Sequence, residues 1–378
     1  MTDPRVERLA ELVVGYSLEL GEGQLVRIDG SEAASPLVVA LHRAALGRGA
    51  HPYVHVQLEG LAELLVTEAS EEQLIYIPPI EWRETELADA LVTIWSRSNT
   101  RSFTRSDPDR HQRYIAAQRR ISQRRWQRIS RGELKWAGTL FPTHAHAQDA
   151  EMSLTEYERF VFGACHVLDG EDPIAHWQGV SAALHDRARS LDHVRELRFL
   201  GPDTDLRVVV EGRRWIAADG KLNMPDGEVF TSPVETGTEG EIRYTFPAIF
   251  NGREVDDVRL RFEGGRVVKA EAARGNDYLH SLLDMDDGSR VLGEVAFGLN
   301  YEIDRFTRDV LFDEKIGGTV HLALGSGFEE VGGRNQSGLH WDMICDLRRE
   351  GEVYADGELI WQAGSFLHEP ASAVEHVG

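Results

Sequence analysis

The segments QLVRIDG (24–30), SPLVVALHRAALGRG (35–49) and HPYVHVQ (51–57) decide the fold of the N-terminal half. The first and third are short runs of apolar and β-branched residues, as strands are. The middle segment has the composition of a helix and ends in glycine, a residue that commonly terminates helices. A strand, a helix and a second strand in this order predict a βαβ unit, and therefore an α/β domain with a mostly parallel sheet.

The same pattern continues downstream, where EQLIYIPP (72–79) and ADALVTIW (88–95) indicate a second strand and a second helix. Gly21-Glu22-Gly23 precedes its strand and has no third glycine in place, which argues against a nucleotide-binding loop. The N-terminal half is therefore expected to be built from βαβ units without a dinucleotide fingerprint.

After about residue 190 the texture changes to short alternating runs separated by glycine and aspartate, such as VRELRFLG (194–201), DLRVVVEG (205–212) and VRLRFEGG (258–265). This is the pattern of strands and hairpins. The length of 378 residues exceeds what one ordinary core serves. We therefore predict an α/β N-terminal domain over residues 1–190 and a β-rich α+β domain over residues 191–378.

Composition excludes several classes of partner. A formal net charge of -22 repels phosphate, so nucleic acid is not expected as a partner. No apolar run is long enough for a bilayer, so no membrane insertion is expected. Only Cys165 and Cys345 are present, and the N-terminus lacks the features of a secretory leader, which predicts a cytoplasmic protein.

Two local clusters have simple interpretations. Residues 111–131 contain seven arginines and no acidic residue. Such a helix can bind RNA, but in an acidic chain we favour pairing with the protein's own carboxylates or with a partner subunit. His144 and His146 form a His-x-His pair without a carboxylate at matching spacing, so surface histidines are favoured over a metal site there.

Near the C-terminus the chain reads SGLHWDM (337–343), which places a histidine and an aspartate two residues apart between large apolar residues. On a strand, His340 and Asp342 share one face while Leu339 and Trp341 share the other. Any half-buried strand can show this alternation. The pair becomes a candidate site only together with other residues.

Three further candidates lie in the same half. Glu294 is the one carboxylate of an apolar run, and a buried carboxylate needs a positive partner, either an arginine or a metal ion. His321 shares its predicted strand face with small neighbours, and Glu228 follows a Pro-Asp-Gly turn. Each has an ordinary structural explanation. The set of five, however, has the donor inventory of two neighbouring divalent ions.

Four segments in order, NMPDGEVFTSP (223–233), LGEVAFG (292–298), LFDEKIGGTVHLALG (311–325) and NQSGLHWDM (335–343), resemble the aminopeptidase T and aminopeptidase S family of thermophilic-type metallo-aminopeptidases. A weaker resemblance covers nearly the whole chain. It implies an α/β domain, a β-rich catalytic domain, a homodimer and hydrolysis of short peptides with a free N-terminus. The implied ligands of two divalent ions (Zn, Co, Mn or Mg) are Glu228, Glu294, His321, His340 and Asp342.

The sequence departs from the family in two respects. Phe328 stands where members usually carry a tyrosine seven residues after the histidine of HLALG, and the segment from His321 to His340 is shorter than in the founding members. A lost phenol removes a donor for a tetrahedral oxyanion. The candidate substitutes are Tyr301, Tyr278 and Lys315, and the candidate general bases are Glu314 and Glu329.

Two other functions stay open on the sequence. His321, His340 and Asp342 alone form a two-histidine, one-carboxylate set of the kind that binds ferrous iron, and ring-cleaving dihydroxypyridine dioxygenases resemble this superfamily. The presence of Glu228 and Glu294 favours two metals and hydrolysis. The third reading is a catalytically weakened homologue that only binds metal, with Phe328 as its mark.

Overall fold

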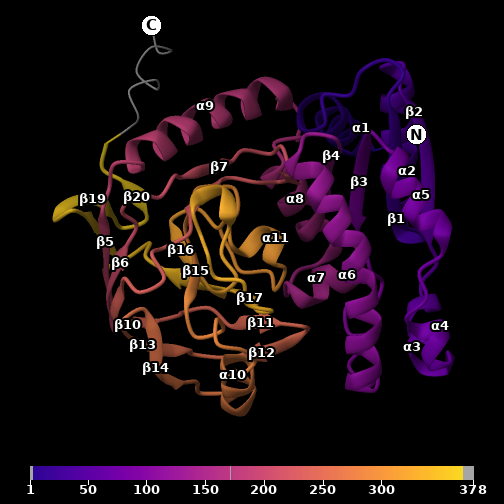
Figure 1. Ribbon diagram of the computed structural model, residues 1–378. Helices are drawn as coiled ribbons and strands as arrows, with labels where there is room; N and C mark the ends of the chain where they lie inside the picture. The colour runs from indigo at the N-terminus through magenta and orange to yellow at the C-terminus, as the bar shows by residue number, and fades with distance from the viewer. Residues whose placement is uncertain (1–2, 171, 369–378) are drawn as a thin grey trace, which may run out of the picture. The chain divides into compact units, whose positions relative to one another are not determined.

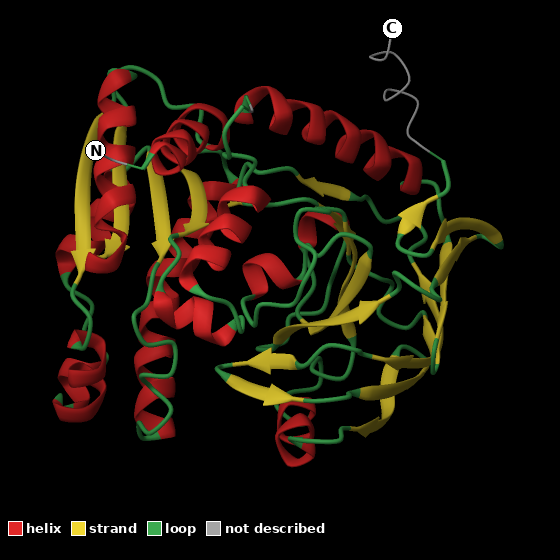
Figure 2. Ribbon diagram, turned by 180° about the vertical axis from the view of Figure 1, so that it is seen from behind, coloured by secondary structure: helices red, strands yellow, loops and turns green. Residues whose placement is uncertain are grey.

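The computed structural model describes residues 3–170 and 172–368. The chain divides into two compact units, Met1–His176 with Gly220–Pro225, and Trp177–Asp219 with Asp226–Gly378. Helices dominate the first unit and strands the second (Figures 1 and 2). The α/β and β-rich fold classes are therefore confirmed. The boundary between residues 190 and 191 stays a prediction, and in the sequence the two units interleave.

The first unit is built on a five-stranded parallel sheet in the order β2-β1-β3-β4-β8. The predicted βαβ unit is present as β1 (Leu25–Ser31), α2 (Ser35–Gly47) and β2 (His51–Gln57). The other strands are β3 (Ala90–Trp95), β4 (Lys135–Leu140) and β8 (Asn223–Met224). The other helices are α1 (Pro4–Leu12), α3 (Leu61–Glu68), α4 (Glu71–Leu74), α5 (Pro79–Leu87), α6 (Pro108–Ser130), α7 (His144–Asp149) and α8 (Leu154–Ala164), and α9 (Pro173–Leu191) leads into the second unit.

The second strand and helix were predicted in reversed order. Residues 72–79 contain most of α4 instead of a strand, because the Ser70 side chain and Gln73 form a capping box that starts a helix. Residues 88–95 contain the strand β3, whose valine, threonine and isoleucine suit a central, largely buried strand. Short apolar runs of this kind do not reveal their type by periodicity.

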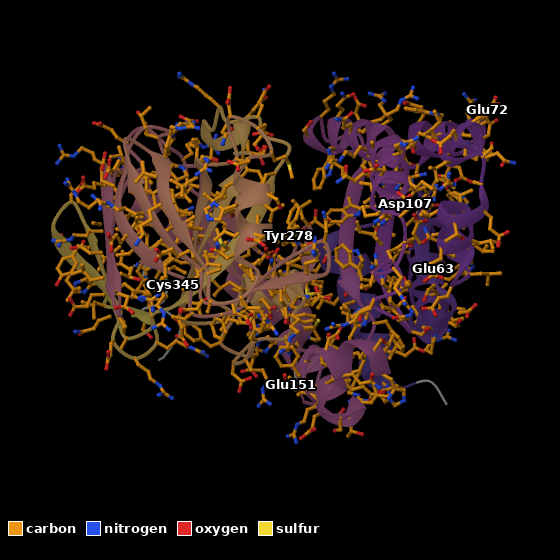
Figure 3. The ribbon with its side chains drawn as sticks, turned by 90° about the horizontal axis from the view of Figure 1, so that it is seen from below. Glu63, Glu72, Asp107, Glu151, Tyr278 and Cys345 are labelled. Atoms are coloured by element: carbon orange, nitrogen blue, oxygen red, sulfur yellow. The ribbon has the colours of Figure 1, made fainter. Side chains whose placement is uncertain are left out.

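The arginine-rich helix α6 faces the protein's own acceptors, as favoured from the sequence. Asp107 caps its N-terminus, while Glu63 and Glu72 belong to the short helices α3 and α4 of the same unit (Figure 3). Ion pairs join Arg110 and Arg113 to Glu71, Arg124 to Glu86 and Arg125 to Glu81. The arginines of this helix therefore help to hold it against α4 and α5.

Among the described residues, the second unit contains two large antiparallel sheets, one of eight strands (β14-β13-β10-β6-β5-β18-β19-β20) and one of five (β17-β16-β15-β9-β7). The eight-stranded sheet consists of β5 (Glu196–Gly201), β6 (Thr204–Val209), β10 (Thr238–Arg243), β13 (Arg259–Glu263), β14 (Arg266–Glu271), β18 (Glu352–Ala355), β19 (Glu358–Gln362) and β20 (Ser365–Phe366). The five-stranded sheet consists of β7 (Ile216–Ala218), β9 (Glu228–Thr231), β15 (Leu292–Gly298), β16 (Thr319–Gly325) and β17 (His340–Asp346). The small hairpin β11 (Ala248–Phe250) and β12 (Arg253–Val255) and the helices α10 (Asn276–Leu283) and α11 (Val310–Asp313) complete the unit.

A continuous hydrophobic core includes residues from both sheets of this unit. Phe199, Val295, Leu322 and Trp341 are among its buried members. Cys345, on β17, is also part of this core and is a free thiol, as is the buried Cys165 (Figure 3). The apolar residues of β15, β16 and β17 thus fill the core, and the alternating residues of these strands point to the opposite face of the five-stranded sheet.

In the described part of the chain, the longest helices are too polar to serve as bilayer-crossing segments.

Candidate metal centre

The five predicted ligands lie on one face of the five-stranded sheet, opposite the core. Glu228 begins β9, Glu294 lies in β15, His321 in β16, and His340 and Asp342 in β17. Ala323 is paired with Glu294 on one side and with Asp342 on the other, and Ala296 is paired with His321. These alanines leave room on the face for the longer side chains beside them. The spacing of two in HWDM therefore does set a shared face.

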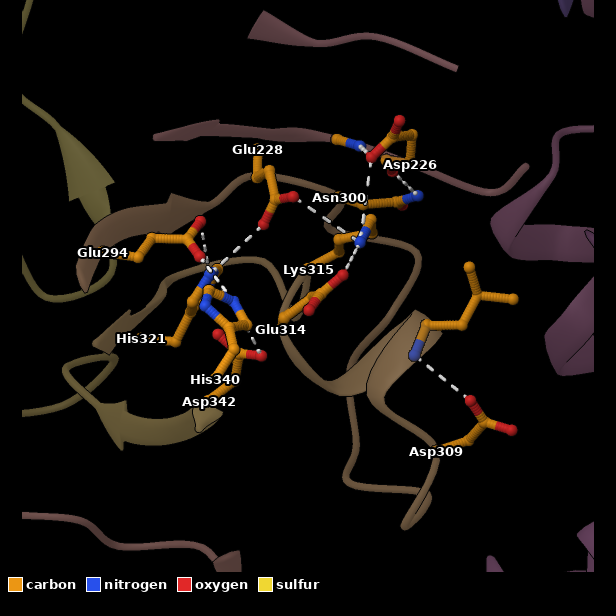
Figure 4. Close-up of polar contacts among 12 residues, drawn as sticks. Asp226, Glu228, Glu294, Asn300, Asp309, Glu314, Lys315, His321, His340 and Asp342 are labelled. Atoms are coloured by element: carbon orange, nitrogen blue, oxygen red, sulfur yellow. Dashed lines mark hydrogen bonds and ion pairs between the residues drawn. The ribbon is translucent and has the colours of Figure 1, made fainter. Parts of the chain in front are cut away.

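The carboxylate of Glu294 contacts both histidines (Figure 4). Its Oε1 is 3.6 Å from His321 Nε2, and its Oε2 is 3.3 Å from His340 Nε2. On the other side of His340, Asp342 Oδ2 is 3.7 Å from the same Nε2. One carboxylate therefore offers a separate oxygen to each imidazole, an arrangement suited to bridging two cations.

The orientation of His340 is fixed from behind. Its Nδ1 donates to the carbonyl oxygen of Ser326 at 2.9 Å. This bond places the proton on Nδ1 and turns Nε2 toward Glu294 and Asp342. A backbone acceptor of this kind commonly sets the tautomer of a metal-binding histidine.

A segment that follows α11 brings two more charged residues to this face. If Gly298 carried a Cβ, that atom would lie 2.4 Å from the carbonyl oxygen of Ile316 and 3.1 Å from that of Glu314. Glycine at this position in β15 is what allows the segment to cross so closely. Glu314 and Lys315 consequently reach the cluster from outside the sheet.

Lys315 is fully buried among carboxylates. Its Nζ contacts Glu314 Oε1 and lies 3.6 Å from Glu228 Oε1 and 3.8 Å from Asp226 Oδ1. Burial acts to lower the pKa of Lys315, but Glu228, Glu314 and Asp226 outweigh it and raise that pKa above its usual range. The buried amine is therefore an ammonium ion.

In the part of the chain that the structure describes, two groups of three His, Cys, Asp or Glu side chains have ligand atoms within 4.8 Å of one another: Glu294 with His340 and Asp342, and Glu314 with His321 and Asp342. Each group joins one imidazole to two carboxylates, and Asp342 belongs to both. The mixed nitrogen and oxygen donors suit Zn, Mn or Co, and carboxylates suit Mg.

Burial and mutual attraction shift the pKa values in the cluster. Burial acts to lower the pKa of His321, but hydrogen bonding with Glu294 and the charge of Glu228 raise it to about 10. Burial also opposes the charged form of His340, whose pKa Asp342 and Glu294 raise to about 10. Burial raises the pKa of Asp342 to about 6 despite His340, and that of Glu228 well above its usual range despite Lys315. Burial acts to raise the pKa of Glu294 too, yet bonds with both histidines lower it to about 2.

The unpartnered atoms of the cluster fit a bound cation. Within residues 3–170 and 172–368, Glu228 Oε2 and Asp342 Oδ1 are buried oxygens with no hydrogen-bond partner. A buried acceptor left in this state costs free energy unless another group satisfies it. A divalent ion on this face would meet that need, and it would compete with the protons that the imidazoles otherwise hold.

The remaining candidates occupy other positions. Glu329 is exposed and accepts a bond from Gln336, and it belongs to neither ligand group. Tyr301 is exposed, and its hydroxyl donates to the carbonyl oxygen of Gly364. Tyr278 donates to the carbonyl oxygen of Phe250. Of the candidate oxyanion donors, Lys315 lies at the cluster. Of the candidate general bases, Glu314 lies there.

Phe328 packs at the edge of the centre. Its ring meets His340 in a T-shaped contact, with centroids 5.4 Å apart, and also contacts Phe230. Its backbone N–H donates to Ser232 Oγ at 2.8 Å, which fixes the loop that carries it. The aromatic position is therefore held beside a candidate ligand without a hydroxyl group.

Sequence reasoning did not identify Asp226 or the Ser326 carbonyl. Asp226 is almost fully buried, although it lies in a Pro-Asp-Gly turn, where aspartate is usually solvated. Backbone acceptors such as Ser326 carry no residue-type signal. Glu314 and Lys315 are adjacent in the segment DEKIGG, but the sequence does not show that both side chains reach the cluster.

The side chains of His144 and His146 do not point to a common site. His144 is exposed, whereas His146 is buried, bonds Thr143 Oγ1 through Nδ1 at 3.0 Å and stacks near Tyr157. Burial, followed by the charge of Arg97, lowers the pKa of His146 to about 4 despite Asp149. This histidine is a neutral core residue of the first unit.

This burial predicts a loss of stability in mild acid. Unfolded His146 binds its proton near pH 6.5 and the folded residue near pH 4, so between these values the unfolded state binds more protons. The free energy of unfolding should therefore fall as the pH is lowered, by about 2 kcal/mol from this residue between pH 7 and pH 5. Urea unfolding of wild type and His146→Gln at both pH values measures it. Equal losses in the two proteins would contradict the assignment, and His144→Gln is the exposed control.

Comparisons with known proteins agree with this architecture. Residues 2–366 match the family described as thermophilic metalloprotease (M29). The chain is 30% identical over 419 residues to aminopeptidase 2 of Geobacillus stearothermophilus, covering 98% of this chain and 99% of that protein. The structure of wild-type AmpT from Thermus thermophilus superimposes with a TM-score of 0.86 at 27% identity, over 96% of this chain and 99% of that one.

A 2,5-dihydroxypyridine dioxygenase from Pseudomonas putida KT2440 shares the fold, with a TM-score of 0.57 at 17% identity over 96% of both chains. At this identity the likeness concerns the fold alone. The family match instead extends over nearly the whole sequence and includes every segment that builds the centre. The chain belongs to the thermophilic metalloprotease (M29) family.

Proposed function

We propose that this metalloprotease is an aminopeptidase that removes the N-terminal residue of short peptides at a centre of two divalent ions. The observation that carries the proposal is the pair of ligand groups that share Asp342, each with its own histidine. The names of its relatives, which are aminopeptidases, support the exopeptidase activity. Short peptides as substrates follow from the resemblance of the motifs.

We assign the ligands as Glu294, His340 and Asp342 at one position, and His321, Asp342, Glu294 and Glu228 at the other. Glu314, the third member of the second observed group, is assigned a different role in hydrolysis. Glu294 offers one oxygen to each histidine, and Glu228 Oε2 is 3.5 Å from His321 Nε2. Charge balance supports two ions. In the metal-bound state, with every carboxyl group ionised and the imidazoles neutral, five carboxylates against one ammonium leave a formal charge of −4. Zn, Co, Mn or Mg can accept these donors.

The residues of the chain would divide the work of hydrolysis. Bound ions would polarise the scissile carbonyl and lower the pKa of a water molecule. The excess of carboxylates attracts the cationic amine of a peptide N-terminus. Glu314 lies within 4.8 Å of ligand atoms of His321 and Asp342, and we assign it to accept the proton of the attacking water.

We further propose a homodimer in the cytoplasm. Val54 and Val56 are 38% and 45% exposed on β2, which is an edge strand of its sheet. An open sheet edge that exposes apolar side chains is a surface on which another chain can pair. The two buried free thiols support a reducing compartment.

The test combines elemental analysis with an assay on matched substrates. The purified protein should contain close to two divalent ions per chain and hydrolyse leucyl amide, but not N-acetyl-leucyl amide, because acetylation removes the amine that the carboxylates attract. Hydrolysis of both substrates would contradict an exopeptidase. One iron per chain without any hydrolysis would favour the dioxygenase, whose two-histidine set would then be the functional one.

Phe328 allows a gain-of-function prediction. Phe328→Tyr should raise kcat for leucyl amide, roughly tenfold, because it adds a donor beside His340 where an oxyanion would develop. Steady-state kinetics compare it with wild type and with Phe246→Tyr, a control whose ring stacks on Phe306 instead. A kcat unchanged by the tyrosine would show that position 328 does not face the reacting carbonyl.

A further inference from the structure

Lys315 is unusual in being a lysine with no exposed surface. A buried ammonium ion is costly unless it is paired, and its four-carbon stem usually carries lysine to the surface. Three carboxylates, from Asp226, Glu228 and Glu314, surround its Nζ (Figure 4). The position of the Lys315 ammonium is therefore set by these three ion pairs and not by apolar packing alone.

One of these three carboxylates is fixed independently of Lys315. Asp226 Oδ1 accepts from the N–H of Gly227, and its carbonyl oxygen accepts from Asn300 Nδ2 at 2.8 Å. The turn therefore holds the Asp226 carboxylate in position to pair with the Lys315 ammonium. Glu228 and Glu314 then meet the ammonium from the side of the cluster that carries His321.

The two oxygens of Glu228 have different surroundings. Oε1 is 3.6 Å from Lys315 Nζ, whereas Oε2 is 3.5 Å from His321 Nε2 and has no hydrogen-bond partner in residues 3–170 and 172–368. Attraction of one oxygen by the ammonium leaves the other directed at the imidazole. Glu314 is held in the same way, with Oε1 on Lys315 and the carboxylate inside the group of His321 and Asp342.

We propose that Lys315 is a positioning residue of the metal centre: its ammonium orients Glu228 so that it presents an oxygen to the ion bound at His321, and it holds Glu314 beside the same position. This role rests on the proposed function only in requiring that the centre bind divalent ions. It does not require that the substrate be a peptide. In this role Lys315 acts through the two carboxylates, because an ammonium ion cannot itself be a ligand of the metal.

The sign of a metal-binding experiment distinguishes positioning from simple charge repulsion. Removing a positive charge near a cation site should tighten cation binding if only Coulomb repulsion mattered. Loss of orientation should instead weaken cation binding. Removal of a residue that hydrogen-bonds or pairs with metal ligands typically lowers metal affinity 10–100-fold, and we expect a loss of about this size.

The experiment titrates Zn²⁺ into metal-free protein in competition with a chromophoric chelator. Lys315→Met should bind one ion about 10–100-fold more weakly than wild type and leave the other little changed. Lys315→Arg, which keeps the charge, should have a Zn²⁺ affinity between that of wild type and that of Lys315→Met. Lys269→Met is the matched control, because Lys269 is an exposed strand residue paired with Glu271. Circular dichroism of the metal-free proteins checks that each is folded.

Unchanged or tighter Zn²⁺ binding by Lys315→Met would overturn the proposal. If that variant does not fold, the wild-type protein still decides, since the chain has four lysines and ¹⁵N labelling of lysine gives few ammonium signals. The signal that is missing in Lys315→Arg should shift during the Zn²⁺ titration, and no shift would refute the role. Failure of the aminopeptidase proposal looks different: wild type would bind ions but not hydrolyse leucyl amide.

Discussion

Glu294→Ala should lower kcat/KM for leucyl amide on the order of 10³-fold and reduce the metal content of the purified protein. The reason is the position of this carboxylate, which offers one oxygen to His321 and the other to His340. Its loss would weaken both ion positions together. Kinetics and elemental analysis on the same preparation measure the two effects.

The matched control for this variant is Glu358→Ala, which removes an exposed carboxylate at the start of β19. It should retain the activity and metal content of wild type. If Glu294→Ala kept its ions and lost less than about tenfold in activity, Glu294 would not be the residue that joins the two positions.

Removal of divalent ions with a chelator should abolish hydrolysis and lower the midpoint of thermal unfolding by several degrees. Without cations, the buried oxygens Glu228 Oε2 and Asp342 Oδ1 have no hydrogen-bond partner among the residues that the structure describes. A ligand present at 100 times its Kd stabilises the folded state by about 2.7 kcal/mol per site. Calorimetry before and after chelation measures the loss, and adding back Zn, Co, Mn or Mg separately identifies the ions that restore activity.

Glu294→Ala also serves as the internal control for chelation. Because it should hold its ions weakly, its unfolding midpoint should respond little to the chelator. A midpoint that falls equally in wild type and variant would place the stabilising ion elsewhere. Loss of stability without loss of activity would assign the ions a structural role.

The sequence was most informative where local pattern and position agree. Spacing of two in HWDM set His340 and Asp342 on one face because strand side chains alternate. Glu294 was conspicuous because a carboxylate in an apolar strand must have a partner. Glu228 and His321 each had an ordinary structural explanation, and they became candidates as members of the set of five, on which the motif resemblance also falls.

The contacts that cross between elements could not be predicted. Glu314 and Lys315 reach the cluster because their segment passes over Gly298, a long-range approach that no periodicity encodes. In the first unit, residues 72–79 and 88–95 exchanged their predicted types, since short apolar runs suit a strand or a helix until capping and burial decide. The sequence could identify ligand types, but only the fold supplies the residues that hold them in place.

Side-chain exposure falls steadily across the centre, from 34% for His340 and 12% for Asp342 to 1% for His321 and none for Lys315. If two ions bind as proposed, this gradient makes their exchange kinetics unequal. The ion at His340 would equilibrate with solvent quickly, while the ion at His321 would leave only when the protein opens. The metal at His340 would then follow the metal concentrations of the surrounding solution, whereas the position at His321 would retain the metal that it first bound.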